Sequence, residues 1–209
     1  DILTIDNRIL DIIMTEKYKK LDYPSYFYPE IKSIVSNIEC VDQKVKELFE
    51  SNQNEFEQKR ENGENDNYVC SLIRDDDIDG FVSYRTKCQI SPCEEVKHSI
   101  FETNYFLLKR QSSLIEYAAF YGSELIFKHL LFSEAEYNSS LWLYSIHSRN
   151  PDMIHILEEK GIKPENEYYR EYVIESIICH HNEIATYIQN NYITVELEID
   201  FFIISKSMK

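Results

Sequence analysis

The chain has 209 residues, and its 43% hydrophobic content is enough to bury a sizeable core as one domain or one elongated array. We therefore expect a folded chain and not one that is disordered throughout. With 37 acidic and 22 basic side chains, the net charge is −15. Repulsion disfavours binding to nucleic acid or to an anionic membrane, so a basic protein surface is the better match for a partner.

The cysteine count points to a reducing compartment. An odd number of scattered cysteines does not form a disulfide framework in a chain of this length. The first residues lack the cationic segment of a secretion signal, and no apolar run approaches the roughly 18 residues of a membrane span. We expect a soluble, cytoplasmic protein with reduced cysteines at Cys40, Cys70, Cys88, Cys93 and Cys179.

Only four Gly and five Pro are present, which favours helices with short connections over an all-β chain. Apolar spacing predicts a first helix ending near Lys19 and a second over 30–37. A third helix is predicted to begin at Asp42, in cap position, and to end at Gly63. We expect residues 1–63 to form an N-terminal helical segment.

An acidic stretch over residues 74–86, RDDDIDGFVSYRT, resembles the opening of a calcium-binding loop. Asp75, Asp77 and Asp79 alternate as calcium ligands would, but Thr86 occupies the position of the bidentate glutamate. The alternative is a helix N-terminus, where acidic side chains are favourable next to unsatisfied N–H groups. We prefer the helix start and predict no calcium site.

Two other chemistries have partial signals. Cys88, Cys93 and His98, with residues 179–181 further along, could be drawn as a zinc site, but a second close cysteine pair is missing. Gly-x-Ser-x-Gly, His-Glu-x-x-His and phosphate-binding glycine loops are absent from the sequence. We predict no metal, no cofactor and no enzymatic activity.

Internal repetition organises the rest of the chain. The segments 113–131, 141–159 and 173–191 each contain an apolar helix pattern, a short polar break and a second apolar helix pattern. The same template places residues 74–84 at the break and second helix of an earlier copy. The sequence therefore predicts an array over 64–209 with repeats near 66–88, 112–138, 139–166 and 170–193, in which neighbours bury one another's apolar faces.

The segment YAAFYGSELIFKHLL resembles the ankyrin pattern of an Ala-Ala pair, two variable residues, Gly and a helix ending in leucines. LEEKGIKPEN is similar to the close of an ankyrin repeat, with Gly161 as C-cap and Pro164 in the exposed finger. Together with other stretches of the chain, these segments resemble the large, divergent ankyrin-repeat family of parasitic protists. That resemblance implies an all-α, helix-turn-helix solenoid.

The chain departs from the ankyrin pattern in two ways. The Thr-Pro-Leu-His stretch is absent, because residues 114–116 are Leu-Ile-Glu. The turn glycine survives as Gly122, whereas Asp76, Arg149 and His180 take its place in the other copies. A left-handed backbone at such residues would cost about 1 kcal/mol or more each. Pro151 suits the first position of the following helix.

The resemblance also implies a binding surface. Ankyrin repeats bind proteins on a concave face of inner helices, through variable residues just before each turn. Transferred position by position, these are Arg74, Asp75, Phe120, Tyr121, His147, Ser148, Ile178 and Cys179. We therefore expect a non-enzymatic protein-interaction module. The alternatives are a structural or autoinhibitory segment of a larger protein, and a weakly metal-responsive domain.

Residues 193–207 alternate apolar and acidic side chains before turning apolar, which is strand-like at first. In a repeat array this segment would enter a further repeat. We expect the chain to be a piece of a longer array, whose exposed repeat ends could support self-association.

Overall fold

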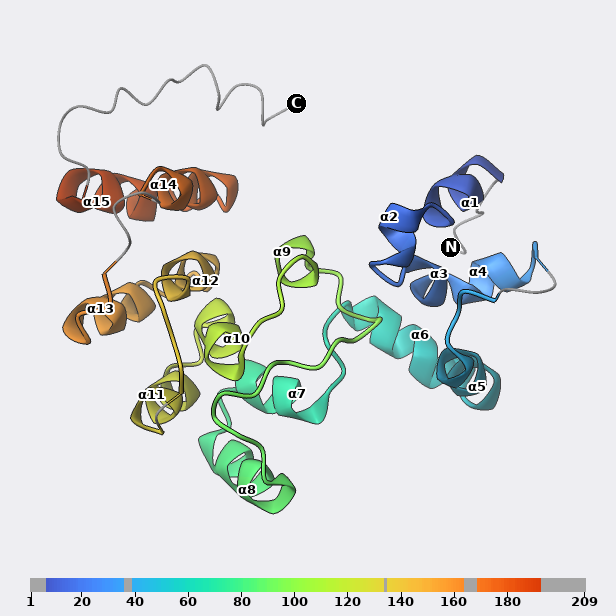
Figure 1. The fold of residues 1–209 in the computed structure, drawn as a ribbon, viewed down its shortest axis with the longest axis horizontal. Helices are drawn as coiled ribbons and strands as arrows, with labels where there is room; N and C mark the ends of the chain where they lie inside the picture. Colours follow the sequence, from blue (N-terminus) through green and yellow to red (C-terminus); the bar gives the residue numbers. More distant parts are fainter. Residues whose placement is uncertain (1–6, 36–38, 134, 164–168, 193–209) are drawn as a thin grey trace. The chain divides into compact units, whose positions relative to one another are not determined.

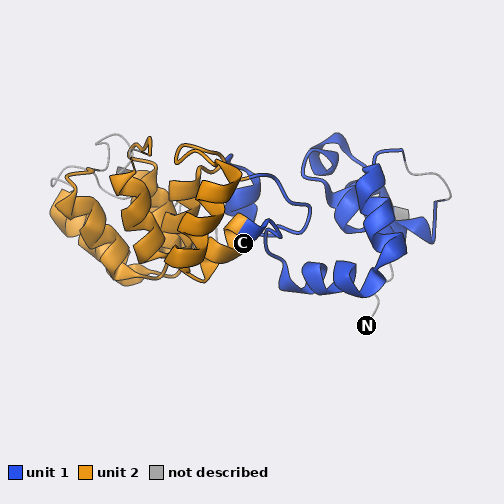
Figure 2. Ribbon diagram, turned by 90° about the horizontal axis from the view of Figure 1, so that it is seen from below, with its two compact units in different colours: residues 1–68, 97–111 blue, residues 69–96, 112–209 orange. Residues whose placement is uncertain are grey.

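The computed structural model describes residues 7–35, 39–133, 135–163 and 169–192, and this part of the chain is all-α. Apart from one isolated bridge between Glu95 and Ser113, its regular elements are helices (Figure 1). The chain divides into unit 1, residues 1–68 and 97–111, and unit 2, residues 69–96 and 112–209 (Figure 2). Pro164 and the 193–207 segment lie outside the described residues.

Unit 1 contains seven of the described helices around an aromatic core. Phe56 is fully buried and packs edge-to-face against Phe49 and Phe101, with ring centroids 5.4 and 5.3 Å away. Such pairs add about 0.5–1.5 kcal/mol beyond area burial. The helices are α1 (Asn7–Ile13), α2 (Glu16–Lys19), α3 (Tyr23–Tyr26), α4 (Tyr28–Lys32), α5 (Gln43–Ser51), α6 (Gln53–Asn62) and α9 (Tyr105–Leu108).

The helix predicted from Asp42 to Gly63 has the expected ends but is broken in the middle. Asp42 is the N-cap of α5, and its carboxylate accepts from the Lys44 N–H. Gly63 ends α6 with φ of 65°. Asn52 separates the two helices, because its side chain caps α6 by accepting from the Glu55 N–H and its backbone is extended.

The other two N-terminal helices also differ from prediction. The first is divided at Thr15, which has an extended backbone and whose hydroxyl donates to the Ile12 carbonyl. The second begins earlier than expected, as α4 at Tyr28, with Pro29 in its first turn. Residues 36–38, where it was predicted to end, are not among those described. Pro24 and Pro29 thus lie in the first turns of the short helices α3 and α4, a position that proline suits.

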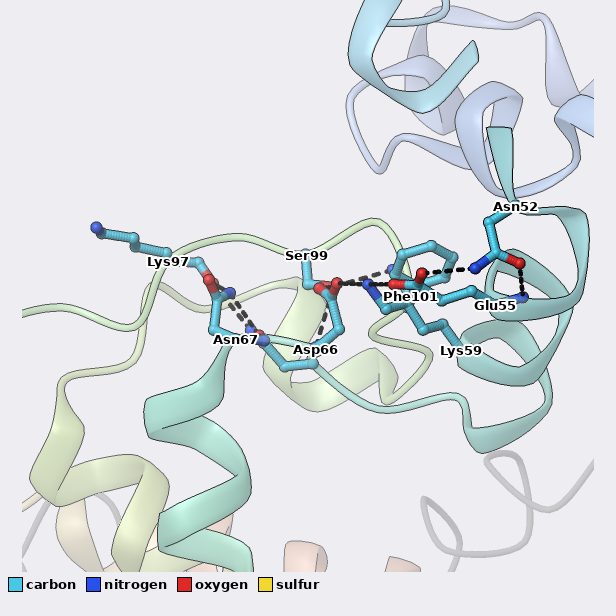
Figure 3. A network of polar contacts seen from close by, with 9 residues as sticks. Asn52, Glu55, Lys59, Asp66, Asn67, Lys97, Ser99 and Phe101 are labelled. Carbon is cyan, nitrogen blue, oxygen red and sulfur yellow. Dashed lines mark hydrogen bonds and ion pairs between the residues drawn. The ribbon is translucent and has the colours of Figure 1, made fainter. Parts of the chain in front are cut away.

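A polar network joins the connection after α6 to the segment 97–103 within unit 1 (Figure 3). The Ser99 hydroxyl donates to Asp66, whose carboxylate also lies 3.1 Å from Lys59 Nζ. The buried Asn65 and its neighbour Asn67 both donate to the Lys97 carbonyl. The bonds that Ser99 and the Lys97 carbonyl make join residues about thirty positions apart in sequence. They hold the segment 97–103, which has no helix of its own, to the chain that follows α6.

The described part of unit 2 contains four helix pairs, and each pair joins a first and a second helix through a short turn (Figures 1 and 2). The first helices α10, α12 and α14 pack against one another in turn, and each also packs against its own second helix. The pairs are α7 (Tyr68–Arg74) with α8 (Ile78–Cys88), α10 (Leu114–Tyr121) with α11 (Glu124–Phe132), α12 (Leu141–His147) with α13 (Pro151–Glu159), and α14 (Tyr169–Ile178) with α15 (Asn182–Tyr192).

The four turns share one backbone conformation. Asp76, Gly122, Arg149 and His180 all have a positive φ, between 49° and 70°. In three of these turns the N–H groups of this residue and the next bond back to the helix end, as at Gly122, in a Schellman motif. The turn at Arg149 differs, because the Asn150 N–H donates to the Ser148 hydroxyl instead of to a carbonyl of the helix end.

A capping box formed by Ser113 and Glu116 begins helix α10. The Glu116 carboxylate accepts from the Ser113 N–H at 2.8 Å, and the Glu116 N–H donates to the Ser113 hydroxyl. The other Glu116 oxygen accepts from the Ser140 hydroxyl, just before α12. One glutamate thus caps its own helix and joins the next helix pair to it.

None of the described helices combines the length and the apolar character that crossing a bilayer requires.

Candidate functional site

Five of the eight residues predicted just before the four turns lie next to one another in unit 2. Arg74 donates to the Tyr117 hydroxyl at 3.0 Å, and its guanidinium carbon is 5.9 Å from the centre of the Tyr121 ring. Tyr121 contacts Phe120 edge-to-face, and the Phe120 ring stacks on His147 with centroids 5.0 Å apart. We call the eight predicted positions the pre-turn row. Five of them, Arg74, Tyr121, Phe120, His147 and Cys179, follow one another in contact.

The row continues from α12 to α14 through a cluster of three polar side chains. His147 Nε2 lies 2.8 Å from Glu175 Oε1, a hydrogen bond between the two first helices. The Cys179 sulfur lies 3.4 Å from His147 Nδ1 and 3.8 Å from Nε2. Glu175 and Cys179 are four residues apart, so they lie on the same side of the end of α14.

The predicted positions differ in how much of each side chain is accessible. Asp75 is exposed, and Ile178 is 54% exposed despite its size. Phe120 is only 8% exposed, so it supports the row from beneath. The Ser148 hydroxyl donates to the Ser145 carbonyl, which makes it a helix-capping group. The remaining four positions are half-buried: Arg74, Tyr121, His147 and Cys179.

Burial shapes the ionisation of the row. It raises the pKa of the Cys179 thiol to about 11, and the negative charge of Glu175 acts in the same direction, while Arg149 opposes it. Burial likewise raises the pKa of the Tyr117 hydroxyl far above its usual value. Both groups are therefore protonated at neutral pH, and Cys179 lacks the thiolate that a nucleophilic cysteine needs.

The acidic stretch at 74–86 uses its carboxylates to cap helices. Both oxygens of Asp76 accept backbone N–H groups at the start of α11, those of Leu125 and Ile126, at 3.0 Å. The Asp77 carboxylate caps α8 by accepting from the Gly80 N–H at 3.0 Å. Helix α8 thus begins inside the stretch that would form the calcium loop, in agreement with the predicted helix start.

Two of the residues considered for zinc, Cys93 and His98, have other neighbours. The Cys93 sulfur accepts from the Glu136 N–H, and His98 Nδ1 lies 3.5 Å from the Asp22 carboxylate. Among the described residues, the group with three metal-ligating atoms close together is His147, Glu175 and Cys179, within 4.8 Å of one another. Cys88 and Cys93 are not part of it.

Two participants in the row were missed by sequence reasoning. Tyr117 holds Arg74, and Glu175 holds His147, yet neither lies next to a turn. Their signal was present as helical spacing, because Tyr117 precedes Tyr121 by four residues and Glu175 precedes Cys179 by four. The prediction considered only the two positions before each turn.

Comparison with known proteins returns no match to any protein-family model, curated protein or solved structure.

Proposed function

We propose that unit 2 is a divergent ankyrin-type repeat array that binds a protein partner along the pre-turn row and performs no catalysis. The observation that carries this proposal is a chain of contacts between pre-turn side chains of four successive helix pairs. Arg74 reaches Tyr121, Phe120 stacks on His147, and the Cys179 sulfur lies 3.4 Å from the His147 ring. A row that repeats with the helix pairs supplies an extended surface for a partner.

The chemistry of the row suits a protein surface. Tyr121 and His147 are aromatic, half-buried and held in place by neighbours, so little side-chain entropy is lost when they are covered. Ile178 adds an exposed apolar side chain at one end, and Asp75 adds a negative charge at the other. Aromatic anchors surrounded by polar groups are typical of protein interfaces.

Charge favours a basic partner. The chain carries −15 overall, and Asp75 is an exposed carboxylate on the row itself. An acidic protein attracts a basic surface over roughly a Debye length, about 8 Å at physiological salt, which accelerates association at low ionic strength. Such binding should weaken as salt is added.

A hydrolytic role for Cys179 is the competing function that a specific observation raises, because Cys179, His147 and Glu175 have the order of a Cys–His–acid triad. Two observations disfavour it. The thiol is protonated at neutral pH, with its pKa raised to about 11. Cys179 directly follows the last residue of α14, and the negative end of a helix dipole destabilises a thiolate.

The test is affinity capture of a protein partner by the parent chain, by a variant of the row and by a matched control variant. Asp75→Ser with Ile178→Ser alters the row, and Asp79→Ser with Leu125→Ser makes the same changes on second helices, where Leu125 is 53% exposed. We expect one partner captured by the parent and the control but at least about tenfold less by the row variant, a loss of 1.4 kcal/mol or more. Equal capture by both variants, or none by the folded parent, would refute the proposal.

A further inference from the structure

We infer that His147, Glu175 and Cys179 form a zinc-binding site with three protein ligands and one open coordination position. The residues bring an imidazole nitrogen, a carboxylate oxygen and a sulfur within 4.8 Å of one another. These are the three ligand types that Zn²⁺ takes in proteins. The inference does not depend on the proposed protein-binding function.

The distances fit a tetrahedral ion. Zinc–nitrogen bonds of about 2.0–2.1 Å and zinc–sulfur bonds of about 2.3 Å place two ligands roughly 3.3–3.6 Å apart at a tetrahedral angle. His147 Nε2 lies 2.8 Å from Glu175 Oε1 and 3.8 Å from the Cys179 sulfur. Both separations are within about 0.5 Å of those values, and the third pair, Glu175 and Cys179, lies within 4.8 Å, so side-chain rotation would complete the geometry.

The surroundings hold the ligands in position. The His147 ring stacks on Phe120 at an interplanar angle of 24°, which fixes the plane of the imidazole. Glu175 and Cys179 are carried on one helical turn at the end of α14, where the helix dipole favours a cation. The positive charge of Arg149 lies near the thiol and repels a cation, but the negative charge of the Glu175 carboxylate, itself a ligand, offsets that repulsion.

Ion binding would exchange protons for metal. The His147–Glu175 hydrogen bond shares one proton, and the thiol carries a second. The thiol proton is released to solvent as the thiolate bonds to Zn²⁺. The proton between His147 and Glu175 moves to His147 Nδ1, so that Nε2 of a neutral imidazole and the carboxylate also bond to the ion. Water or an added ligand such as imidazole fills the fourth position.

The test is zinc binding to the full chain, measured by competition with a chromophoric chelator. Cys179→Ser and His147→Gln each remove one ligand, and Cys88→Ser with His155→Gln is the matched control, with both residues exposed and outside the cluster. Loss of even an outer-shell partner weakens metal affinity about 10–100-fold, so we expect at least a tenfold loss in each ligand variant and none in the control.

Two measurements on the parent chain keep the inference testable if a ligand variant fails to fold. Co²⁺ should give a thiolate charge-transfer band, and Zn²⁺ should protect Cys179 from alkylation while the exposed Cys40 and Cys88 react. Zinc affinity equal in the ligand variants and the control would overturn the inference. A Co²⁺ complex without the thiolate band, or no zinc binding at micromolar concentration, would also do so.

Discussion

The left-handed turn at Arg149 gives the sharpest test of how this fold tolerates turn residues other than glycine. Arg149 has φ of 56° in the same turn position where Gly122 has 70°. Its side chain is exposed, so replacing it removes no buried packing. We predict that Arg149→Gly stabilises the protein, because glycine adopts this conformation without the clash of a Cβ atom.

The magnitude follows from two opposing contributions. A residue with a Cβ atom loses roughly 1–2 kcal/mol in the left-handed region. Glycine gives back roughly 0.5–1 kcal/mol through its greater freedom in the unfolded chain. The net gain is therefore about 0.5–1 kcal/mol, a rise in melting temperature of roughly 1–4 °C. Arg149→Ala is the control, since it removes the charge but keeps the strain.

Asp76→Gly tests the same reasoning, but here we expect a loss of stability instead of a gain. Asp76 has φ of 49°, so glycine relieves a similar strain, but the carboxylate that accepts from the Leu125 and Ile126 N–H groups is lost. Loss of a helix cap costs about 0.5–2 kcal/mol, and these two bonds reach a charged acceptor, so we expect a net loss near 1 kcal/mol. Urea unfolding followed by circular dichroism measures both variants. Shifts of equal sign and size would refute the assignment of strain and capping to these residues.

Two further predictions concern buried polar groups. The Ser145 hydroxyl is buried without a hydrogen-bond partner, so Ser145→Ala should stabilise the protein by about 1 kcal/mol in urea unfolding, whereas Ser176→Ala, which removes a bonded hydroxyl, should destabilise it. A gain in both variants would contradict this. Burial opposes ionisation of Glu158, but hydrogen bonds from the Tyr187 and Tyr192 hydroxyls outweigh it and lower its pKa. Its stabilisation is thus present above its unfolded pKa and lost as pH falls through the folded value. Tyr187→Phe should destabilise the protein by about 1 kcal/mol at pH 7 and much less at pH 3, and a difference that does not change with pH would contradict the role of that hydrogen bond.

Local signals in the sequence predicted the features that depend on local chemistry. Asp42 and Gly63 are found as helix caps, because a cap is decided by a residue and its next few neighbours. Asn52 was assigned to a continuous helix, since apolar spacing does not reveal that an asparagine will cap the following turn instead. The bond from Asp76 to α11 spans about fifty residues, and no local pattern encodes it. Glu175 was missed for the same reason, because its partner lies on another helix.

The pre-turn row follows from the packing of the first helices rather than from any single motif. Four residues before the left-handed positions Gly122, Arg149 and His180, the chain places the small residues Ala118, Ser145 and Ser176, all fully buried. Small side chains there leave room for α10, α12 and α14 to pack closely, so the side chains two residues further along meet across the helices, as Phe120 and His147 do. Because backbone and small residues set this geometry, the row residues themselves are free to differ. Two row residues, His147 and Cys179, together with Glu175 from the last turn of α14, form the proposed zinc site.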